Sequence, residues 1–232
     1  YPAFRIPTVC IPASIDNNLP GSELSIGTDT ALNVIVEAMD KIKESGIASR
    51  RCFVVETMGR DCGYLALMSG IAAGAERIYT NEDGISLDDL ANDVHWLREL
   101  FAHGRRLFLA VRNENASHNY TTDFIARLLE EESHGMYDVR QVVLGHMQQG
   151  GSPSPFDRLL ANRLGYRALN LIDDELAAHQ DGSWFIGVNE SGMRPCSMDT
   201  MPSLIDAAHR RPREQWWLQL RTIARMVSDE VR

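Results

Sequence analysis

The sequence has 232 residues, of which 44% are hydrophobic and 24% are charged. These values are typical of a soluble globular protein with one large domain or two small lobes. Its formal net charge of -9 disfavours nucleic acid and anionic membranes as partners of the whole surface. No apolar run approaches the ~18 residues of a membrane-spanning helix, and no signal peptide is visible, so we expect neither nucleic acid nor a membrane as a partner.

The four cysteines are scattered and include no Cys-x-x-Cys pair. This pattern favours a reducing compartment, the cytoplasm, over a disulfide framework or a zinc site. The seven histidines are dispersed as well, so we expect no metal site built from several histidines. The chain opens on Tyr1 rather than Met and in mid-pattern, which we interpret as a fragment or a trimmed chain.

The first predicted element is a short buried strand, residues 8–11, which ends in the polar stretch 14–18. Pro, Ser, Asp and Asn turn the chain and present side chains at the carboxyl end of a strand. Ligands bind at that end of an open α/β sheet. Asp16 is therefore a candidate general base, and the alternative is an Asx-rich turn in which Asp16 caps the next segment.

After this turn, helical and strand-like patterns alternate. In chain order they are helix 30–44, strand 51–57, helix 64–73, strand 77–80, helix 88–103, strand 107–111, helix 121–132, strand 138–144, helix 155–173, strand 183–188 and helix 214–228. No internal repeat, low-complexity segment or flexible linker interrupts the series. The alternation predicts an α/β fold with a largely parallel sheet flanked by helices, a Rossmann-like lobe.

Polar side chains gather where four predicted strands end, at residues 14–18, 58–60, 112–114 and 146–149. Loop 58–63 carries two glycines before a helix, which suits an anion, although such loops often serve only packing. Loops of this composition suit a phosphorylated, polyhydroxylated small molecule, with arginines holding the phosphates.

Three further residues and one segment remain to be interpreted. A lone histidine such as His146 is usually structural, but its glycine-rich loop makes a ligand role plausible. Arg51 and Arg140 begin two strands, so in a parallel sheet they would face away from these loops and serve a neighbouring subunit. The basic, aromatic segment 209–217 either docks its tryptophans on the core or sends one arginine to a phosphate.

Four segments together resemble the ATP-dependent 6-phosphofructokinases, in family order and over about residues 7–225: SIDNNLPGSELSIGTDTALN, VVETMGRDCGYLAL, LGHMQQGGSPSPFDR and HRRPREQWW. The phrases NYTTDFI, GHMQQGGSP and REQWW resemble the C-terminal, regulatory half of the long eukaryotic-type enzymes. The resemblance implies a glycolytic kinase that transfers the terminal phosphate of MgATP to the 1-hydroxyl of fructose 6-phosphate. It also implies a phosphofructokinase-like fold.

Several positions acquire roles from this resemblance. Asp16 falls on the catalytic base, and Asn18 stands where catalytic copies carry a second aspartate tied to magnesium. Gln149 stands where catalytic copies carry a phosphate-binding arginine, as in the regulatory half, whose pocket takes fructose 2,6-bisphosphate. The implied sugar-phosphate or effector pocket comprises Ser14, Asn17, Asn18, Arg51, Met58, Gly59, Arg60, Glu114, Arg140, His146, Gln149 and Arg210. Arg51 and Arg140 would serve a neighbour's site.

We therefore expect residues 1–232 to form one sugar-phosphate-binding region, mainly an allosteric fructose 2,6-bisphosphate pocket. ATP and Mg²⁺ would serve the parent enzyme; a Gly-Gly-Asp-Gly-Ser nucleotide loop is missing, so this segment should bind neither and be inactive alone. Its expected partners are fructose phosphates and either copies of itself or the missing catalytic half. One alternative is a catalytic half, because Asp16 is retained where animal regulatory halves have lost it. The other is a purely structural, oligomerising half.

Overall fold

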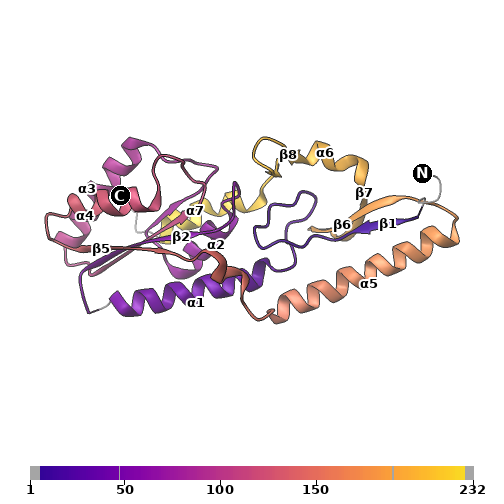
Figure 1. The fold of residues 1–232 in the computed structure, drawn as a ribbon, viewed down its shortest axis with the longest axis horizontal. Coiled ribbons are helices and arrows are strands. Elements are labelled where there is room, and N and C mark those ends of the chain that lie inside the picture. The colour runs from indigo at the N-terminus through magenta and orange to yellow at the C-terminus, as the bar shows by residue number, and fades with distance from the viewer. Residues whose placement is uncertain (1–5, 47, 190, 228–232) are drawn as a thin grey trace. The chain divides into compact units, whose positions relative to one another are not determined.

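The computed structural model describes residues 6–46, 48–189 and 191–227. The chain forms two compact units. Unit 1 comprises Tyr1–Thr30 and Ser152–Trp216, and unit 2 comprises Ala31–Gly151 and Trp217–Arg232. Strands and helices alternate along the chain, as the ribbon in Figure 1 shows.

Every predicted element has a counterpart among the elements described, and the segment between β6 and α7 contains short elements that were not predicted. In chain order the elements described are β1 (Thr8–Cys10), α1 (Thr28–Gly46), β2 (Arg51–Thr57), α2 (Tyr64–Ala73), β3 (Arg77–Tyr79), α3 (Leu87–Ala102), β4 (Leu107–Asn113), α4 (Thr122–Glu131), β5 (Asp138–Val143), α5 (Pro155–Ala177), β6 (Ser183–Asn189), β7 (Gly192–Ser197), α6 (Met201–Leu204), β8 (Ile205–Asp206), β9 (Arg211–Pro212) and α7 (Arg221–Val227). Short 3₁₀ helices occupy Gly145–Gln149, Met198–Thr200 and Trp216–Leu220.

Unit 2 is built on a four-stranded sheet in the order β3-β4-β2-β5, with every neighbouring pair parallel. The central strands β2 and β4 are buried along most of their length, because their apolar runs are covered on both faces. Leu97 and Phe101 of α3 and Ile125 of α4 pack on one face in a single core cluster. In Figure 1, α3 and α4 lie on the opposite side of the sheet from α1.

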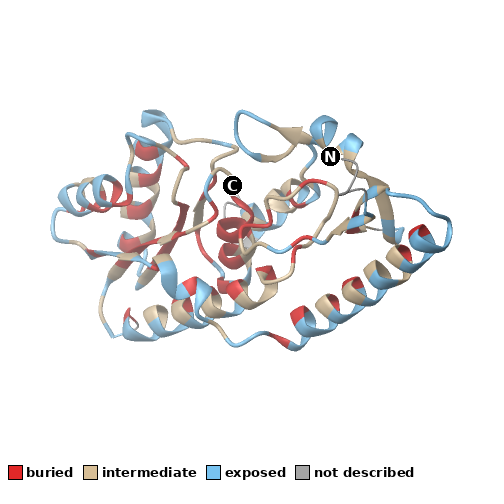
Figure 2. Ribbon diagram, turned by 45° about the vertical axis from the view of Figure 1, so that its right-hand side comes forward, coloured by how far each residue is buried: buried red, intermediate tan, exposed pale blue. Residues whose placement is uncertain are grey.

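Unit 1 is built on the three-stranded sheet β1-β6-β7. β1 runs parallel to β6, and β7 returns antiparallel beside β6. Helix α5 covers this sheet through Leu160, Leu164 and Leu171, which cluster with Ile186 of β6. Figure 2 shows buried positions recurring along one side of α5 and exposed positions along the other.

The predicted fold class is confirmed: parallel strands are flanked by helices. The strands divide among three sheets, the third being the antiparallel pair β8-β9. The strands β8 and β9 were not predicted, and neither was β7. Its sequence, Gly-Met-Arg-Pro-Cys-Ser, contains Pro195, which has no amide hydrogen to donate and is tolerated only at a sheet edge, the position that β7 holds.

The predicted helix boundaries differ most from the structure in α5 and α7, whereas those of α1, α3 and α4 differ by one or two residues. Helix α5 continues four residues beyond 173, to Ala177, because the acidic residues there are compatible with a helix and Glu175 accepts a hydrogen bond from the amide of Gly182 (3.0 Å). The predicted helix 214–228 begins as a 3₁₀ turn, and its α-helical part starts at Arg221, while residue 228 lies outside the described residues.

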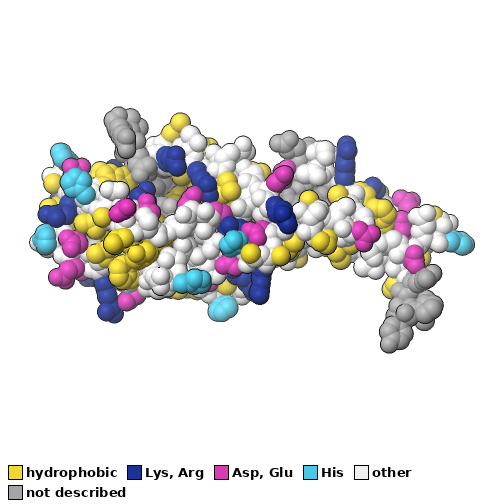
Figure 3. All heavy atoms as spheres, turned by 90° about the horizontal axis from the view of Figure 1, so that it is seen from above, with side chains coloured by type: hydrophobic (Ala, Val, Ile, Leu, Met, Phe, Trp, Pro, Cys, Tyr) yellow, Lys and Arg dark blue, Asp and Glu magenta, His cyan; other side chains and the backbone are white. Residues whose placement is uncertain are grey.

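None of the helices in the described ranges is long and apolar enough to cross a membrane. On the face drawn in Figure 3, Lys and Arg side chains are interspersed with Asp and Glu, with no large patch of one sign.

Candidate functional site

The predicted site residues fall in both units. Ser14, Asp16, Asn17, Asn18 and Arg210 belong to unit 1. Unit 2 contributes Arg51, Met58, Gly59, Arg60, Glu114, Arg140, His146 and Gln149. Each group forms a local arrangement that can be described on its own.

In unit 1, the turn after β1 is held by its own side chains. The hydroxyl of Ser14 donates to Oδ1 of Asn18 (3.1 Å) and accepts from the amide of Asp16 (3.2 Å). The carbonyl of Ser14 accepts from the hydroxyl of Thr28 at the start of α1 (2.8 Å). Asp16 is 8% exposed, so this turn holds a nearly buried carboxylate close to the carboxyl end of a strand, where a ligand-binding residue was predicted.

Asn17 is tied into the same loop. Its φ of 54° lies in the left-handed region, which Asn adopts more readily than most residues. Its Nδ2 donates to the carbonyl of Glu23 (2.8 Å), and its Oδ1 accepts from the amide of Ser25 (2.9 Å). These bonds close the loop back on itself, so Asn17 shapes the turn that presents Asp16.

In unit 2, the loop after β2 is joined to the residue that follows β4. The carboxylate of Glu114 accepts from the amides of Gly59 (3.0 Å) and Arg60 (2.7 Å). Thr57 and Asn113 are register partners in β2 and β4, so the two loops leave the sheet side by side. The structure therefore brings Gly59, Arg60 and Glu114 together, as the strand-end pattern predicted.

Gly59 shows why this loop needs a glycine. Its φ is 135°, and a Cβ atom would lie 2.5 Å from the carbonyl oxygen of Cys62. Only glycine accepts both the backbone angle and the close approach.

The loop after β5 is connected to the loop after β2 by a residue that sequence reasoning missed. Oε1 of Gln148 accepts from the amide of Met58 (3.0 Å), and Gln148 is buried. The exposed neighbours His146 and Gln149 pair with each other, Nδ1 to Oε1 at 3.2 Å. The sequence signal for this contact was the pair Gln148-Gln149. The two side-chain amides become different only when the 3₁₀ turn forms and buries Gln148.

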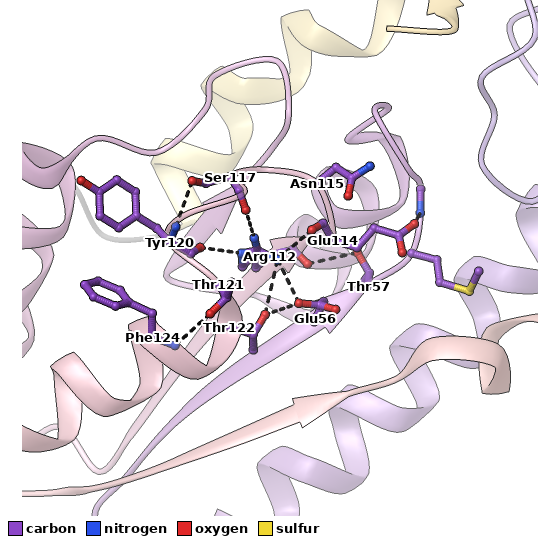
Figure 4. Close-up of polar contacts among 12 residues, drawn as sticks. Glu56, Thr57, Arg112, Glu114, Asn115, Ser117, Tyr120, Thr121, Thr122 and Phe124 are labelled. Atoms are coloured by element: carbon purple, nitrogen blue, oxygen red, sulfur yellow. Dashed lines mark hydrogen bonds and ion pairs between the residues drawn. The ribbon is translucent and has the colours of Figure 1, made fainter.

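A buried arginine, also missed, organises the segment after β4 (Figure 4). Arg112 is 1% exposed, and its Nη1 forms an ion pair with Glu56 of β2 (2.9 Å). The same guanidinium donates to the carbonyls of Glu114 (3.0 Å), Ser117 (2.6 Å) and Tyr120 (3.2 Å). Burial lowers the pKa of Arg112, and the carboxylate of Glu56 acts in the opposite direction.

This network determines how Glu114 is presented. Three carbonyls of one segment converge on a single guanidinium, whose donors have a fixed planar geometry. Thr122 at the start of α4 donates its hydroxyl to Glu56 and completes the cluster. The sequence signal for this network was a charged residue, Arg112, at the end of a buried strand. From the sequence, Arg112 was grouped with the polar side chains that follow strands and not with the residues that hold a loop in place.

Arg51 is the first residue of β2, as predicted, whereas Arg140 is the third of the six residues of β5 and does not begin its strand. Arg51 is the register partner of Asp138, and Arg140 is the partner of Phe53. Six residues of extended strand separate Arg51 from the loop after β2, a distance of about 20 Å. Within unit 2, Arg51 therefore lies at the other end of the sheet from Glu114 and His146, while Arg140 lies partway along its strand.

The start of α2 does not offer an anion site. The amide of Gly63 donates to the carboxylate of Glu82, at 3.1 and 3.0 Å from its two oxygens. A Cβ on Gly63 would lie 2.6 Å from Cβ of Thr80. The structure thus favours the packing alternative for this glycine, since an acidic side chain of the protein already occupies the helix terminus.

Arg210 lies in the turn between β8 and β9, exposed and with a φ of 51°. Next to it, Nδ1 of His209 lies 2.7 Å from Oδ2 of Asp206, and this hydrogen bond lowers the pKa of the Asp206 carboxyl. The turn therefore presents Arg210 to solvent.

Two cavities lie apart from the predicted residues. One, of about 280 Å³, is in unit 2 and is lined in part by Arg77, Asp83 and Arg221. The other, of about 410 Å³, is in unit 1 and is lined in part by Glu23 and Trp216. Neither is lined by a residue of the predicted pocket.

The residues present do not fit a magnesium ion. Among the described residues, no group of three or more His, Cys, Asp and Glu side chains could hold a metal. Beside Asp16 stands Asn18, whose carboxamide is neutral and whose oxygen already accepts from Ser14. Magnesium prefers carboxylates and near-ideal octahedral geometry, which this turn does not supply.

Comparison with known proteins gives a consistent result. A family model described as Phosphofructokinase matches residues 2–172. The chain is 42% identical over 238 residues to the platelet-type ATP-dependent 6-phosphofructokinase of Rattus norvegicus, and 44% identical over 234 residues to the muscle type of Homo sapiens. These alignments cover 98% and 96% of this chain but only 30% of each relative.

The structural comparison agrees. The chain is similar to the phosphofructokinase of Saccharomyces cerevisiae, with a TM-score of 0.94 and 36% identity, over all of this chain and 32% of that one. It is also similar to the Pichia pastoris phosphofructokinase in the T-state, with a TM-score of 0.92 and 35% identity.

Proposed function

Because this chain belongs to the phosphofructokinase family, we propose that it is the sugar-phosphate-binding part of an ATP-dependent 6-phosphofructokinase, and that its pocket is an allosteric fructose 2,6-bisphosphate site. In this proposal the parent protein acts in cytoplasmic glycolysis and uses MgATP. The chain contributes regulation rather than phosphoryl transfer.

One observation carries the proposal: three neighbouring parallel strands end in loops that are hydrogen-bonded to one another. Glu114 holds the amides of Gly59 and Arg60, and Gln148 holds the amide of Met58. Backbone and carboxylate groups fixed in this way suit the hydroxyls of a sugar, because they need no rearrangement on binding.

The exposed pair His146 and Gln149 supports a regulatory pocket. In the proposed site, His146 meets a phosphate, and the neutral Gln149 replaces the arginine of a catalytic copy. Asn18 supports the same assignment, since a carboxamide cannot supply the negative charge that a catalytic magnesium needs. These residues best suit a site that binds a sugar phosphate without phosphorylating it.

A bisphosphate needs more positively charged side chains than one chain presents in the loops that follow β2, β4 and β5. Arg51 begins β2 and Arg140 lies in the first half of β5, and we assign both to the site of a second copy, with Arg210 as a further phosphate contact. Such a shared site couples ligand binding to assembly, because each copy completes its neighbour's pocket.

The direct test is a calorimetric titration of the chain with fructose 2,6-bisphosphate and with fructose 6-phosphate, with its mass measured by light scattering. Tighter binding of the bisphosphate supports the proposal. Tighter binding of fructose 6-phosphate supports instead a catalytic half with Asp16 as base. An assembled protein that binds neither sugar is the structural, oligomerising alternative.

The shared site can be tested by mixing variants. His146→Ala and Arg140→Ala should each weaken bisphosphate binding by at least about tenfold. A mixture of the two, dissociated and reassembled, should regain tight binding at some sites, because one hybrid site combines both intact residues. His95→Ala, on the exposed face of α3, is the matched control and should bind normally. A mixture that recovers nothing contradicts the sharing of Arg140.

A further inference from the structure

The cavity of about 280 Å³ in unit 2 lies along one edge of the sheet. Its lining includes every residue from 76 to 80, and β3 is the outermost strand in the order β3-β4-β2-β5. Successive side chains of a strand point to opposite faces of its sheet, so a cavity that contacts five residues in a row lies beside the edge of the strand. The cavity therefore adjoins the backbone of β3 as well as its side chains.

The backbone of Tyr79 is turned toward this cavity. The amide of Glu76 donates to the carbonyl of Leu109 (3.0 Å), so the backbone of Glu76 faces β4. Backbone groups of successive residues in a strand point to opposite edges, which turns the amide and carbonyl of Tyr79, three residues later, away from β4. The hydroxyl of Tyr79 donates to Asp93 (2.6 Å) and fixes the residue in place. A ligand would meet main-chain groups that are already ordered.

Another wall of the cavity is one side of helix α7. Arg221, Ala224 and Arg225 line it, and the small alanine leaves room between the two arginines. Like charges four residues apart on a helix repel each other, so an anionic group placed between them is stabilised. Trp217, just before α7, is 2% exposed and packs edge-on against Tyr64 of α2, with ring centroids 5.8 Å apart. This contact anchors the wall to the core of unit 2.

Arg221 has a donor that the protein does not use. Its Nη2 pairs with Oδ1 of Asp83 (3.1 Å), and Oδ2 of Asp83 accepts from the hydroxyl of Thr80 (2.8 Å). Its Nε is shielded from solvent and has no hydrogen-bond partner among the described residues. A shielded donor without an acceptor costs free energy. The carboxylate of a ligand can supply that acceptor while Asp83 keeps Nη2.

The charges of the lining favour a ligand that carries both signs. The cavity has as many acidic as basic side chains: Arg77, Arg221, Arg225, Glu76, Asp83 and Asp89. A phosphate or polycarboxylate between the two arginines of α7 would also face the two aspartates, which repel it. An ammonium group beside a carboxylate is attracted to both signs. Arg221 and Asp83 present opposite charges 3.1 Å apart, a spacing similar to that of the two charged groups of an α-amino acid.

We propose that this cavity binds a free α-amino acid. Its carboxylate binds Arg221 and Arg225, and its ammonium group binds Asp83. Leu67 and Ile78 also line the cavity and suit an apolar side chain. The volume is that of a small-molecule site, too small for a helix or strand of another protein segment. The proposal rests on contacts within unit 2 and does not depend on sugar-phosphate binding.

The first test uses the unmodified chain and L-leucine as the probe. Titration into the ¹⁵N-labelled chain, followed by NMR, should give saturable binding with a Kd of about 1 mM. The amides of Gly84 and Ala224, which line the cavity, should shift. Isocaproate lacks the ammonium group and isopentylamine lacks the carboxylate, while both keep the apolar chain of leucine. Each should bind at least about tenfold more weakly than L-leucine.

Variants assign the two charged groups. Arg221→Gln should weaken L-leucine binding at least about tenfold, whereas Arg127→Gln, at an exposed arginine of α4, should leave it unchanged. Asp83→Asn should weaken the binding of L-leucine but not that of isocaproate, because only leucine carries the ammonium group. The spectra of the variants without ligand show whether α7 still packs on α2.

Three outcomes overturn the proposal. One is the absence of shifts at Gly84 and Ala224 with about 20 mM L-leucine, well above the expected Kd. Another is equal binding of isocaproate and L-leucine, which indicates a site for carboxylates alone. The third is tighter binding of inorganic phosphate than of L-leucine at the same amides, which indicates an anion site. All three are measured on the unmodified chain, so they hold even if a variant does not fold.

Discussion

At the residue scale, Arg112 shows how a buried charge can be structural and still shape a binding loop. Its guanidinium sits between Glu56 of β2 and the carbonyls of the segment that follows β4. A buried ion pair adds little net stability, but removal of one partner leaves the other charge without compensation. The loop that presents Glu114 therefore depends on a residue that would not contact a ligand.

We expect Arg112→Met to lower the free energy of unfolding by about 3 kcal/mol, because Glu56 and three carbonyls lose their donor. Urea denaturation measures this loss. Arg127→Met is the matched control: Arg127 pairs with Asp123 at the surface and should contribute less than about 0.5 kcal/mol. Equal losses in the two variants would show that the buried network is not stabilising.

The two glycines Gly59 and Gly165 should respond to alanine in opposite directions. Gly59→Ala should cost about 2 kcal/mol, since its Cβ meets the carbonyl of Cys62 and its φ is positive. Gly165 lies inside α5, where a Cβ meets nothing within 4 Å, so Gly165→Ala should stabilise by about 0.5–1 kcal/mol. Urea midpoints at one protein concentration compare them; stabilisation by Gly59→Ala would contradict the strain argument.

At the element scale, helix α3 begins with a reciprocal pair of hydrogen bonds. The hydroxyl of Ser86 accepts from the amide of Asp89 (3.1 Å), and the carboxylate of Asp89 accepts from the amide of Ser86 (2.9 Å). The hydrogen bond from the Ser86 hydroxyl lowers the pKa of Asp89 from its usual 3.8. The folded protein therefore favours the charged carboxylate.

We expect Asp89→Ala to cost about 1 kcal/mol at neutral pH. Because the pKa of Asp89 is lower folded than unfolded, its stabilisation is present above 3.8 and is lost as the pH falls through the folded value. The difference between the two proteins should therefore shrink below about pH 4 in urea titrations. Asp88→Ala, in the same helical turn without the capping bond, should cost only a few tenths of a kcal/mol; a pH-independent difference for Asp89→Ala would contradict this account.

At the scale of the whole molecule, the position of each strand in its sheet should set its local stability. In unit 2, β2 and β4 are central and β5 is an edge strand. We expect the amides of β2 and β4 to exchange slowest with deuterium, and those of β5 that face away from β2 to exchange much faster. Hydrogen exchange followed by NMR tests this, and equal protection of β5 would show that its outer edge is covered in solution.

Much of this protein is determined by local sequence. The apolar runs of β2 and β4 indicated central parallel strands because burial on both faces requires apolar side chains at every position. The polar residues that follow these strands indicated the loops that now lie together at Gly59 and Glu114, since parallel neighbours end at the same edge. The roles assigned to single positions such as His146 rest on family resemblance and stay predictions.

Only the tertiary structure decided the rest. The division into two units, the edge strand β7, the buried Arg112 network and the contact of Gln148 with Met58 all depend on residues distant in sequence. The local sequence pattern indicates which positions of a segment are buried, but not which other segment packs against them. For this reason the sequence by itself determined which segments are strands, helices and polar strand-end loops, while the folded chain decided which side chains hold those loops in place.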